Sequence, residues 1–369
     1  MKVDWQTKPF EECIEKVVYT QKIQRKDFLD DGTYPIVSQE EDFINGYWNN
    51  EADLFRVVTP VVVFGDHTKV LKFVDFDFVL GADGVKILQP REFLEPRFFF
   101  YQLQTADLDS LGYARHYKLL KELEIGYPAL SEQQRIVAIL DEAFDGIATA
   151  KANTEKNLQN ARALFESYLN AVFTQRAEGW IEATLGEVCE FIGGSQPPKS
   201  VFEKSATTEN VRLIQIRDYK SDKHLVFIPR KLARRFCNAD DVMIGRYGPP
   251  LFQILRGIEG AYNVALMKAV PDESKLSRDF LFYYLKHSAI LEYIIHHSAR
   301  AAGQIGVTKE TLEPYPIALP SLAVQKKVVG TIVELESETH RLETHYQRKL
   351  AALDELKKSL LHQAFSGAL

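Results

Sequence analysis

Cysteine is scarce in this sequence, and long hydrophobic runs are missing altogether. The three cysteines, Cys13, Cys189 and Cys237, form no even-numbered disulfide set and no metal-binding spacing, which favours a reducing compartment. No stretch approaches the ~18 consecutive apolar residues that a membrane helix needs. The opening residues, MKVDWQTKPF, lack the apolar core of a secretory signal. We therefore expect a cytoplasmic protein with no disulfide framework and no membrane contact.

Signatures of catalysis are also scarce. No G-x-x-x-x-G-K-(S/T) loop for a nucleotide phosphate occurs. The run Gly248-Pro249-Pro250-Leu251 lacks the polar and aromatic residues of an adenine methyltransferase motif. Asp272-Glu273-x-Lys275 superficially suggests a nuclease, but other metal ligands are missing, and a solvated turn is the simpler interpretation. Asp75 and Asp77 alternate along an expected strand, where exposed carboxylates are commoner than metal ligands. We expect no catalytic residue, metal site or cofactor in this chain.

Charge is spread unevenly along the chain. The net charge is −6 over 369 residues, a length that predicts two or more domains. Lys and Arg minus Asp and Glu give −7 in residues 1–130 and −2 in 131–180, but +2 in 181–320 and +1 in 321–369. The net negative charge argues mildly against nucleic-acid binding by the whole surface, but the distribution matters more than the total. The second half is locally basic, and the first half is acidic.

A repeat dominates what the sequence does contain. YPALSEQQRIVAIL (127–140) returns as LPSLAVQKKVVGTI (319–332), an offset of 192 positions that places Gln133 on Gln325 and continues without a gap to Phe173 and Phe365. Repeats of this kind dictate architecture. The chain is therefore expected to contain the same structural unit twice.

Each copy of the repeat reads as one long helix. Apolar residues step by three and four, which is typical of a coiled-coil seam, whereas an amphipathic helix on a globular core would carry a wider stripe. The expected seam residues are Ile136, Leu140, Ile147, Leu158 and Leu164 in the first helix and Val328, Ile332, Leu335, Leu342, Leu353, Leu356 and Leu360 in the second. A helix of about 45 residues extends ~65–70 Å.

The intervening segments read as mixed α/β globules. Strand-like runs occur at 34–38, 56–65, 76–81, 211–216 and 241–248, and helices are expected at 92–104 and 278–297. The globules echo each other, since Trp5 aligns with Trp180 and Glu12 with Glu187. We predict an α/β (mixed α+β) chain with a pseudo-two-fold internal repeat, in which the two long helices form an antiparallel coiled coil between the globules. The expected domains are 1–127 and 180–317 for the globules, and 128–179 and 318–369 for the helices.

This order of segments resembles the specificity (S) subunit of type I restriction–modification systems. The likeness covers nearly the whole chain, through ALSEQQRIVAIL and LPSLAVQKKVVGTI at the helix starts and through FESYLNAVFTQ and KKSLLHQAFSGAL near the helix ends. WIEATLGEVCEFIGGSQPPKS (180–200) resembles the opening of a target recognition domain. The second helix departs from the family pattern, with Val324 where the first has Glu132.

The resemblance implies a DNA-recognition role without chemistry of its own. Each globule would be a target recognition domain that reads one half of a split site in double-stranded DNA, and the helices would set the spacer. The helices would also dock two modification (methyltransferase) subunits that use S-adenosylmethionine. Motor or restriction subunits, which use ATP and Mg, would complete the complex.

Basic, hydrogen-bonding and aromatic residues mark the candidate DNA contacts. Arg can read guanine and Gln adenine, whereas Lys is expected on phosphates. In the second globule these residues are Ser195, Gln196, Lys199, Arg212, Gln215, Arg217, Tyr219, Lys220, Arg234, Arg235, Arg246, Tyr247, Arg300, Gln304 and Lys309. In the first globule they are Lys22, Arg25, Lys26, His67, Thr68, Lys69, Tyr113, Arg115, His116, Tyr117 and Lys118.

Alternatives to DNA contact remain at this point. Single charged residues are more often solvated surface than ligand contacts. His67 and His116 are more typical of structural or DNA-contacting histidines than of catalytic bases, because no nucleophile is placed beside them. A coiled-coil scaffold that organises protein partners without reading DNA is the second functional hypothesis.

Overall fold

The computed structural model describes residues 5–82, 84–106, 108, 115–174, 179–298 and 306–366. The chain divides into two compact units, each of which contains one globule and part of both long helices. Unit 1 comprises Met1–Glu155 and Gln347–Leu369, and unit 2 comprises Lys156–Tyr346.

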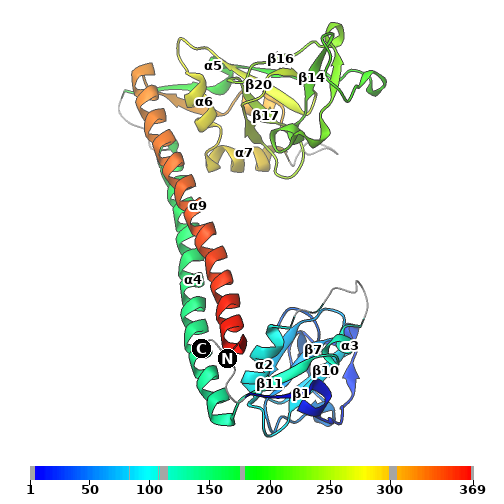
Figure 1. The fold of residues 1–369 in the computed structure, drawn as a ribbon. Coiled ribbons are helices and arrows are strands. Elements are labelled where there is room, and N and C mark those ends of the chain that lie inside the picture. Colours follow the sequence, from blue (N-terminus) through cyan, green and yellow to red (C-terminus); the bar gives the residue numbers. More distant parts are fainter. Residues whose placement is uncertain are drawn as a thin grey trace. The chain divides into compact units, whose positions relative to one another are not determined.

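The globule of unit 1 is built on two small sheets and a two-stranded ribbon (Figure 1). One sheet has the order β2-β10-β7-β8, the other has β3-β9-β4-β5 with β6 also paired to β9, and β1 pairs with β11. The elements are β1 (Gln6–Pro9), α1 (Phe10–Cys13), β2 (Ile14–Glu15), β3 (Lys22–Ile23), β4 (Tyr34–Val37), β5 (Gly46–Trp48), β6 (Leu54–Phe55), β7 (Val61–Gly65), β8 (Leu71–Val74), β9 (Phe78–Gly81), β10 (Val85–Pro90), α2 (Pro96–Gln104), α3 (Tyr117–Leu120) and β11 (Glu124–Tyr127).

The globule of unit 2 repeats this plan. Its sheets have the orders β13-β20-β17-β18 and β15-β14-β19-β16, and β12 pairs with β21. The elements are β12 (Ile181–Thr184), α5 (Leu185–Val188), β13 (Cys189–Gly193), β14 (Asn210–Ile214), β15 (Phe227–Pro229), β16 (Phe236–Cys237), β17 (Val242–Gly245), β18 (Gln253–Leu255), β19 (Gly260–Tyr262), β20 (Leu266–Pro271), α6 (Arg278–Tyr284), α7 (Ser288–Ser298), α8 (Lys309–Leu312) and β21 (Pro316–Leu319).

Strand pairing confirms that the globules are equivalent. β4 runs parallel to β9 and antiparallel to β5, as β14 does to β19 and β15. β10 pairs antiparallel with β7, as β20 does with β17. The predicted mixed α/β character and the internal repeat are therefore both present.

Several expected elements are shorter in the structure, since the helix expected at 92–104 begins at Pro96 and the strand expected at 241–248 is Val242–Gly245. Two others differ more. The strand expected at 56–65 is shorter, because β7 begins only at Val61. The helix expected at 278–297 is two helices, α6 and α7. His287 Nδ1 donates a hydrogen bond to the Tyr284 carbonyl. At the start of α7, the Ser288 amide donates to Asn170 Oδ1 (2.8 Å).

Two long helices, α4 (Leu130–Thr174) and α9 (Leu322–Ser366), enter both units. In unit 1, Ile136 and Leu140 share a buried cluster with Leu361 and Phe365, and Lys151 pairs with Asp354. Early α4 therefore lies against late α9, which is antiparallel packing.

Unit 2 contains the complementary stretches of the same helices. Leu169 and Phe173 share a buried cluster with Ile332, and Arg162 Nε lies 2.5 Å from Glu343 Oε1. Late α4 therefore lies against early α9, which is again antiparallel packing.

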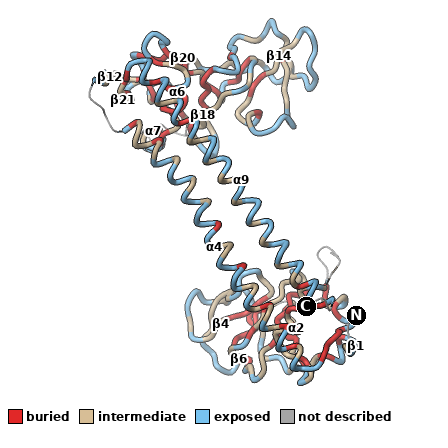
Figure 2. Tube along the Cα trace, turned by 60° about the vertical axis from the view of Figure 1, so that its left-hand side comes forward, coloured by how far each residue is buried: buried red, intermediate tan, exposed pale blue. Residues whose placement is uncertain are grey.

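The covered stripe of the helices departs from the predicted seam at two equivalent positions. Leu164 is 65% exposed and Leu356 is 46% exposed, so the prediction for these two residues is wrong. The half-buried Phe165 and Lys357 occupy the stripe instead, and Lys357 Nζ lies 5.0 Å from the centre of the Phe144 ring. The other predicted seam residues are buried (Ile136, Leu140, Ile147, Ile332) or half-buried (Leu158, Val328, Leu335, Leu342, Leu353, Leu360). Figure 2 colours both helices by burial, with their exposed stretches in pale blue.

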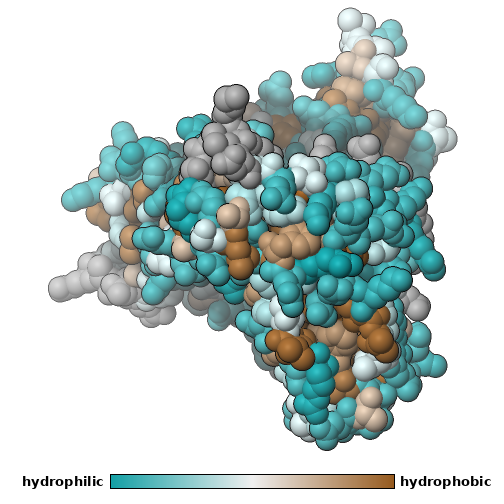
Figure 3. Space-filling model, turned by 60° about the horizontal axis from the view of Figure 1, so that its bottom comes forward, coloured by the Kyte–Doolittle hydropathy of each residue, from teal (hydrophilic) through white to brown (hydrophobic). Residues whose placement is uncertain are grey.

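The hydrophobic cores lie inside the globules and extend onto the helices. In unit 1 the largest cluster joins Phe10, Phe98 and Phe99 to α4 and α9, and in unit 2 it joins Phe280 and Tyr284 to them. Hydrophilic side chains cover most of the face drawn in Figure 3, with hydrophobic residues gathered in a few places. Within the described ranges, no helix combines the length and apolar character needed to cross a bilayer.

Candidate nucleic-acid interface

The loops at one end of the unit 1 sheet are joined by backbone hydrogen bonds. The Asp66 amide, just after β7, donates to the Gly84 carbonyl (2.7 Å), and the His116 amide donates to the Asp66 carbonyl (2.8 Å). The His67 amide donates to Gln39 Oε1 (3.2 Å). Gly84 has φ +74°, a left-handed backbone conformation that favours glycine. The side chains after β4, β7 and β9 and before α3 are thereby fixed together.

A cavity of about 660 Å³ opens at this end, which we call the unit 1 loop end. It brings together four predicted DNA-contacting residues from three separate stretches of sequence. Its lining residues are Lys22, Arg25, Gln39, Glu40, Asp66, His67, Ala82, Gly84, Lys86 and Arg115. Strand pairing explains why Lys22 and Arg25 lie near Gln39, because β3 and β4 both pair with β9.

Positive charge prevails in this cavity although the globule as a whole is acidic. Glu40 is already paired with Arg25 (3.0 Å), and the buried Asp66 accepts a hydrogen bond from the Tyr117 amide (2.8 Å). Lys22, Lys86 and Arg115 remain as additional cations, and Lys86 Nζ lies 5.2 Å from the centre of the Tyr117 ring. Such a concave cationic surface with an amide side chain suits a phosphate backbone and base edges.

The remaining predictions in unit 1 divide into buried and exposed residues. His116 is only 1% exposed, and its Nδ1 lies 3.0 Å from the Asp66 carbonyl oxygen. The prediction that its side chain contacts DNA directly is therefore wrong. Tyr117 is half-buried and packs edge-on against Phe10. Lys26, Thr68 and Lys118 are exposed, and Lys69 is half-buried with its Nζ 3.3 Å from the Leu108 carbonyl. Tyr113 lies outside the described residues.

Unit 2 has the same loop arrangement at the equivalent end of its sheet. The Arg246 amide, just after β17, donates to the Ala265 carbonyl (2.9 Å), and the Val307 amide donates to the Arg246 carbonyl (3.0 Å). The Ser195 amide donates to the Tyr262 carbonyl (3.1 Å). A Cβ on Gly194 would lie 1.9 Å from the Asn263 carbonyl oxygen, so only glycine fits. We call this surface, with Ser195, Gln196, Arg246, Tyr247, Val264 and Val307, the unit 2 loop end.

Arg246 holds the unit 2 loop end together. Its Nε donates to the Val307 carbonyl (2.8 Å) and its Nη1 to the Val264 carbonyl (3.3 Å). The guanidinium also lies 5.1 Å from the centre of the Tyr247 ring. The residue expected to contact DNA is therefore a half-buried clamp between two loops.

A second cluster surrounds β14. Arg212 pairs with Asp222 (3.0 Å) and lies 3.8 Å from the buried Asp218, whose pKa is raised by burial. At the start of the short helix Ile216–Tyr219, the Gln215 amide donates to Asp218 Oδ2 (3.1 Å). Burial also raises the pKa of Tyr219, whose hydroxyl is enclosed although the residue as a whole is half-buried. The predicted DNA contact of Tyr219 stays a prediction.

Exposed cations and amides complete the unit 2 surface. Gln196, Lys199, Arg217, Lys220, Arg234, Arg235 and Lys309 are exposed, while Ser195 and Tyr247 are half-buried. Arg234 and Arg235 precede β16, which pairs with β19 beside β14. Arg300 and Gln304 lie outside the described residues.

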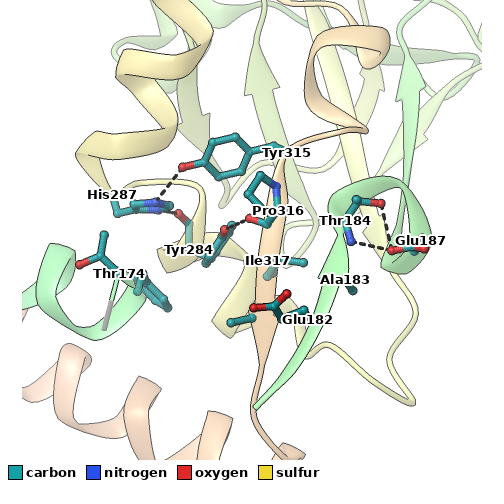
Figure 4. A pocket seen from close by; sticks show the side chains of 12 residues that line it. Thr174, Glu182, Ala183, Thr184, Glu187, Tyr284, His287, Tyr315, Pro316 and Ile317 are labelled. Atoms are coloured by element: carbon teal, nitrogen blue, oxygen red, sulfur yellow. Dashed lines mark hydrogen bonds between the residues drawn. The ribbon is translucent and has the colours of Figure 1, made fainter. Parts of the chain in front are cut away.

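An aromatic-walled cavity of about 500 Å³ lies elsewhere in unit 2, between the end of α4, the β12–β21 ribbon and α6 (Figure 4). Its histidine, His287, is buried, and burial lowers its pKa. Nδ1 faces the Tyr284 carbonyl, and Nε2 lies 3.4 Å from the Tyr315 hydroxyl. A neutral histidine held in this way has a structural role.

Metal-binding and reactive groups do not gather among the described residues. There, no three His, Cys, Asp or Glu side chains lie together as metal ligands would. Burial raises the pKa of Cys13 to about 11, that of Cys189 to about 12 and that of Cys237 to about 11, so these thiols are unreactive near neutral pH.

Two residues of the unit 1 loop end were missed by sequence reasoning. Gln39 follows β4 and Lys86 lies in β10, where alternating burial turns it away from the core. A polar residue directly after a strand and a lysine inside an apolar strand were the available signals.

Comparisons with known proteins agree with this architecture. A family model described as the type I restriction modification DNA specificity domain matches residues 2–160 and 177–352. The specificity subunit of the Escherichia coli type I restriction enzyme EcoR124I/EcoR124II is 28% identical over 198 residues, which cover 49% of this chain. The match spans about half of that relative's length (47%).

Solved structures share the fold across the whole chain. A chain from a structure of complex assembly and conformational transition of the type I R-M system has a TM-score of 0.75 at 19% identity, covering 100% of this chain and 99% of that chain. The HsdS subunit from Thermoanaerobacter tengcongensis has a TM-score of 0.59 at 20% identity, with coverages of 100% and 98%. With the family model matching both globules and most of both helices, the chain belongs to the type I restriction–modification DNA specificity domain family.

Proposed function

We propose that this chain is the DNA specificity subunit of a type I restriction–modification complex, in which each unit reads one half of a bipartite site. The observation that carries the proposal is the pair of equivalent loop ends in a chain of this family. The unit 1 loop end follows β7 and the unit 2 loop end follows β17, which are equivalent strands of equivalent sheets. Hydrogen-bonding and cationic side chains gather on or beside each loop end.

The two units would read DNA with different side chains. In unit 1, Arg25, Gln39 and Arg115 can reach base edges, while Lys22 and Lys86 suit phosphates. In unit 2 the exposed candidates are Gln196, Lys199, Lys220, Arg234 and Arg235. Because the side chains differ between the units, the two half-sites are expected to differ in sequence.

The helices would set the distance between the half-sites and dock partner subunits. A 45-residue helix extends about 68 Å at 1.5 Å per residue, which compares with ~34–36 Å for one turn of DNA. Two modification subunits would bring S-adenosylmethionine and adenine methylation, and motor subunits would bring ATP and Mg. The whole complex would work in the cytoplasm on double-stranded DNA.

Methylome sequencing tests this proposal directly. Cells that express the chain with its modification subunit should carry a split motif with N6-methyladenine on each strand, and cells lacking only this chain should lose it. The assembled complex should also bind DNA less tightly as salt rises, because phosphate contacts release counterions. An unchanged methylome together with a flat salt response would favour a protein scaffold instead.

A further inference from the structure

A buried lysine anchors one loop of unit 1. Lys72 lies in β8 and is only 3% exposed, although lysine is almost never fully buried unless it is paired. Its Nζ donates to the carbonyls of Asp42 (2.5 Å) and Phe43 (3.4 Å). It also donates to Asn45 Oδ1 (3.1 Å). All three acceptors belong to residues 38–45, which connect β4 to β5 and which we call the β4–β5 loop.

The β4–β5 loop supports two candidate base-reading side chains of the unit 1 loop end. Gln39 belongs to the loop and lines the cavity. Arg25 also lines the cavity, and its Nη1 donates to the Asn45 carbonyl (3.0 Å). Resting on the proposed function, we propose that Lys72 is a positioning residue whose ammonium group fixes this loop and thereby sets how unit 1 reads its half-site.

The charged form of Lys72 matches the acceptors of the loop. An ammonium group has three N–H donors, one for each acceptor, whereas a neutral amine has only two. Asn45 connects these bonds to both ends of the loop, because its Oδ1 also accepts from the Ser38 amide (2.8 Å) and its Nδ2 donates to the Asp42 carbonyl (2.8 Å). Burying a charge is costly unless it is hydrogen-bonded, and here every bond orders the same loop.

The fold itself does not require a lysine at this position. Lys72 faces Val63 across the β7–β8 pair, as Leu255 faces Met243 across the equivalent β17–β18 pair. An apolar side chain therefore fits the position in unit 2. There, the loop after β14 is held by its own buried Asp218, whose Oδ2 accepts a backbone amide (3.1 Å). The ammonium group of Lys72 thus serves the unit 1 loop rather than the packing of the sheet.

Lys72 loses its proton at a lower pH than an ordinary lysine. Burial lowers its pKa to about 8, and the loop carboxylates of Glu40 and Asp42 oppose that shift only in part, while β7 places the apolar Val63 beside it. Raising the pH above about 8 therefore removes the third donor from the loop.

Stability responds to this titration with the opposite sign. The unfolded chain keeps the proton up to the ordinary lysine pKa of about 10.4, so the stability contributed by this group rises with pH over the same range. A loss of half-site reading at high pH that depends on Lys72 thus reports the position of the loop and not unfolding.

Binding of the assembled complex to libraries of half-site variants, at pH 7 and pH 9, tests this role. At pH 7, Lys72→Met should lower the discrimination at the half-site of unit 1 about tenfold, because it removes hydrogen bonds from a charged group. Discrimination at the half-site of unit 2 should stay unchanged, which provides an internal control. The wild-type complex should lose discrimination at the half-site of unit 1 between pH 7 and pH 9, and Lys72→Met should show the same values at both. Lys16→Met, at an exposed lysine outside the cavity, is the matched control and should behave as wild type.

The outcomes separate this inference from the proposed function. Wild-type discrimination by Lys72→Met, or an equal loss at both half-sites, would overturn the positioning role while the reading of two half-sites stands. If Lys72→Met does not fold, the wild-type profile decides, since discrimination by unit 1 that persists at pH 9 would overturn the role. A wild-type complex without preference at either half-site would overturn the proposed function as well.

Discussion

Gln133 and Gln325, which stand 192 residues apart, make the same three hydrogen bonds. Gln133 Oε1 accepts from the Glu95 amide (2.8 Å), and its Nε2 donates to the Phe93 and Pro128 carbonyls (2.9 Å each). Gln325 Oε1 accepts from the Ser277 amide (2.9 Å), and its Nε2 donates to the carbonyls of Lys275 (2.7 Å) and Pro320 (2.9 Å). Both glutamines are fully buried. Each therefore fixes a long helix to the globule of its own unit.

Replacing either glutamine by leucine should destabilise its own unit. The Gln133→Leu change leaves the Glu95 amide without its acceptor and the Phe93 and Pro128 carbonyls without their donor. We expect the free energy of unfolding to fall by about 2–3 kcal/mol. Gln325→Leu should cost a similar amount in unit 2. Urea unfolding measures the loss, and Gln134→Leu, at the exposed neighbouring position, is the control. Equal stabilities of Gln133→Leu and Gln134→Leu would refute the role assigned to the buried side chain.

The repeat was the strongest signal in the sequence. An ungapped offset of 192 residues predicts that Gln133 and Gln325 share one environment, and their hydrogen bonds agree. The long helices and the mixed α/β globules follow from the same pattern. Periodicity could not decide which residue continues the seam after Ala161. A step of three leads to Leu164 and a step of four leads to Phe165, and both are large apolar residues. The structure follows the step of four.

The sequence did not predict which distant residues the candidate DNA-contacting side chains would contact. Arg246 resembles a free guanidinium, but its acceptors belong to Val264 and Val307, 18 and 61 positions further along the chain. The unit 1 loop end similarly joins Lys22 of β3, Gln39 after β4, Lys86 of β10 and Arg115 before α3, which come from two different sheets and a connecting segment. The local sequence around each of these residues does not reveal contacts with residues far away in the chain.

Arg115 and Lys86 should affect DNA binding in different ways. If Arg115 reads a base edge, Arg115→Ala costs about 1–3 kcal/mol of binding and relaxes one half-site. Lys86→Ala should weaken binding to all sequences alike and reduce the salt slope by about one. Binding of the assembled complex to a library of half-site variants, at several salt concentrations, separates the two effects.

The control for this pair is Lys16→Ala, which removes an exposed lysine that does not line the cavity. Lys16→Ala should change the half-site preference less than Arg115→Ala does. It should also change the salt slope less than Lys86→Ala does. Equal effects of all three variants would mean that only the net charge matters, and the unit 1 loop end would lose its assignment.

Acid should destabilise unit 2 through His287. Burial lowers the pKa of this imidazole, so the unfolded state takes up a proton more readily than the folded state. Stability contributed by neutral His287 is therefore present above the ordinary histidine pKa of about 6.5 and is lost as pH falls below it. Relative to His287→Gln, which cannot titrate, the wild-type urea midpoint should decline between pH 7 and pH 5. Parallel pH profiles of the two proteins would contradict this prediction.

Shortening both helices by one heptad should change the spacer alone. Lys151 pairs with Asp354 and Arg162 with Glu343, so the facing heptads are 151–157 and 348–354. Removing both shortens the helices by about 10 Å, or about three base pairs at 3.4 Å per pair. Methylome sequencing should find the same half-sites with a spacer about three base pairs shorter. Altered half-sites with an unchanged spacer would defeat the idea that the helices measure the gap, because the loop ends are untouched by the deletion.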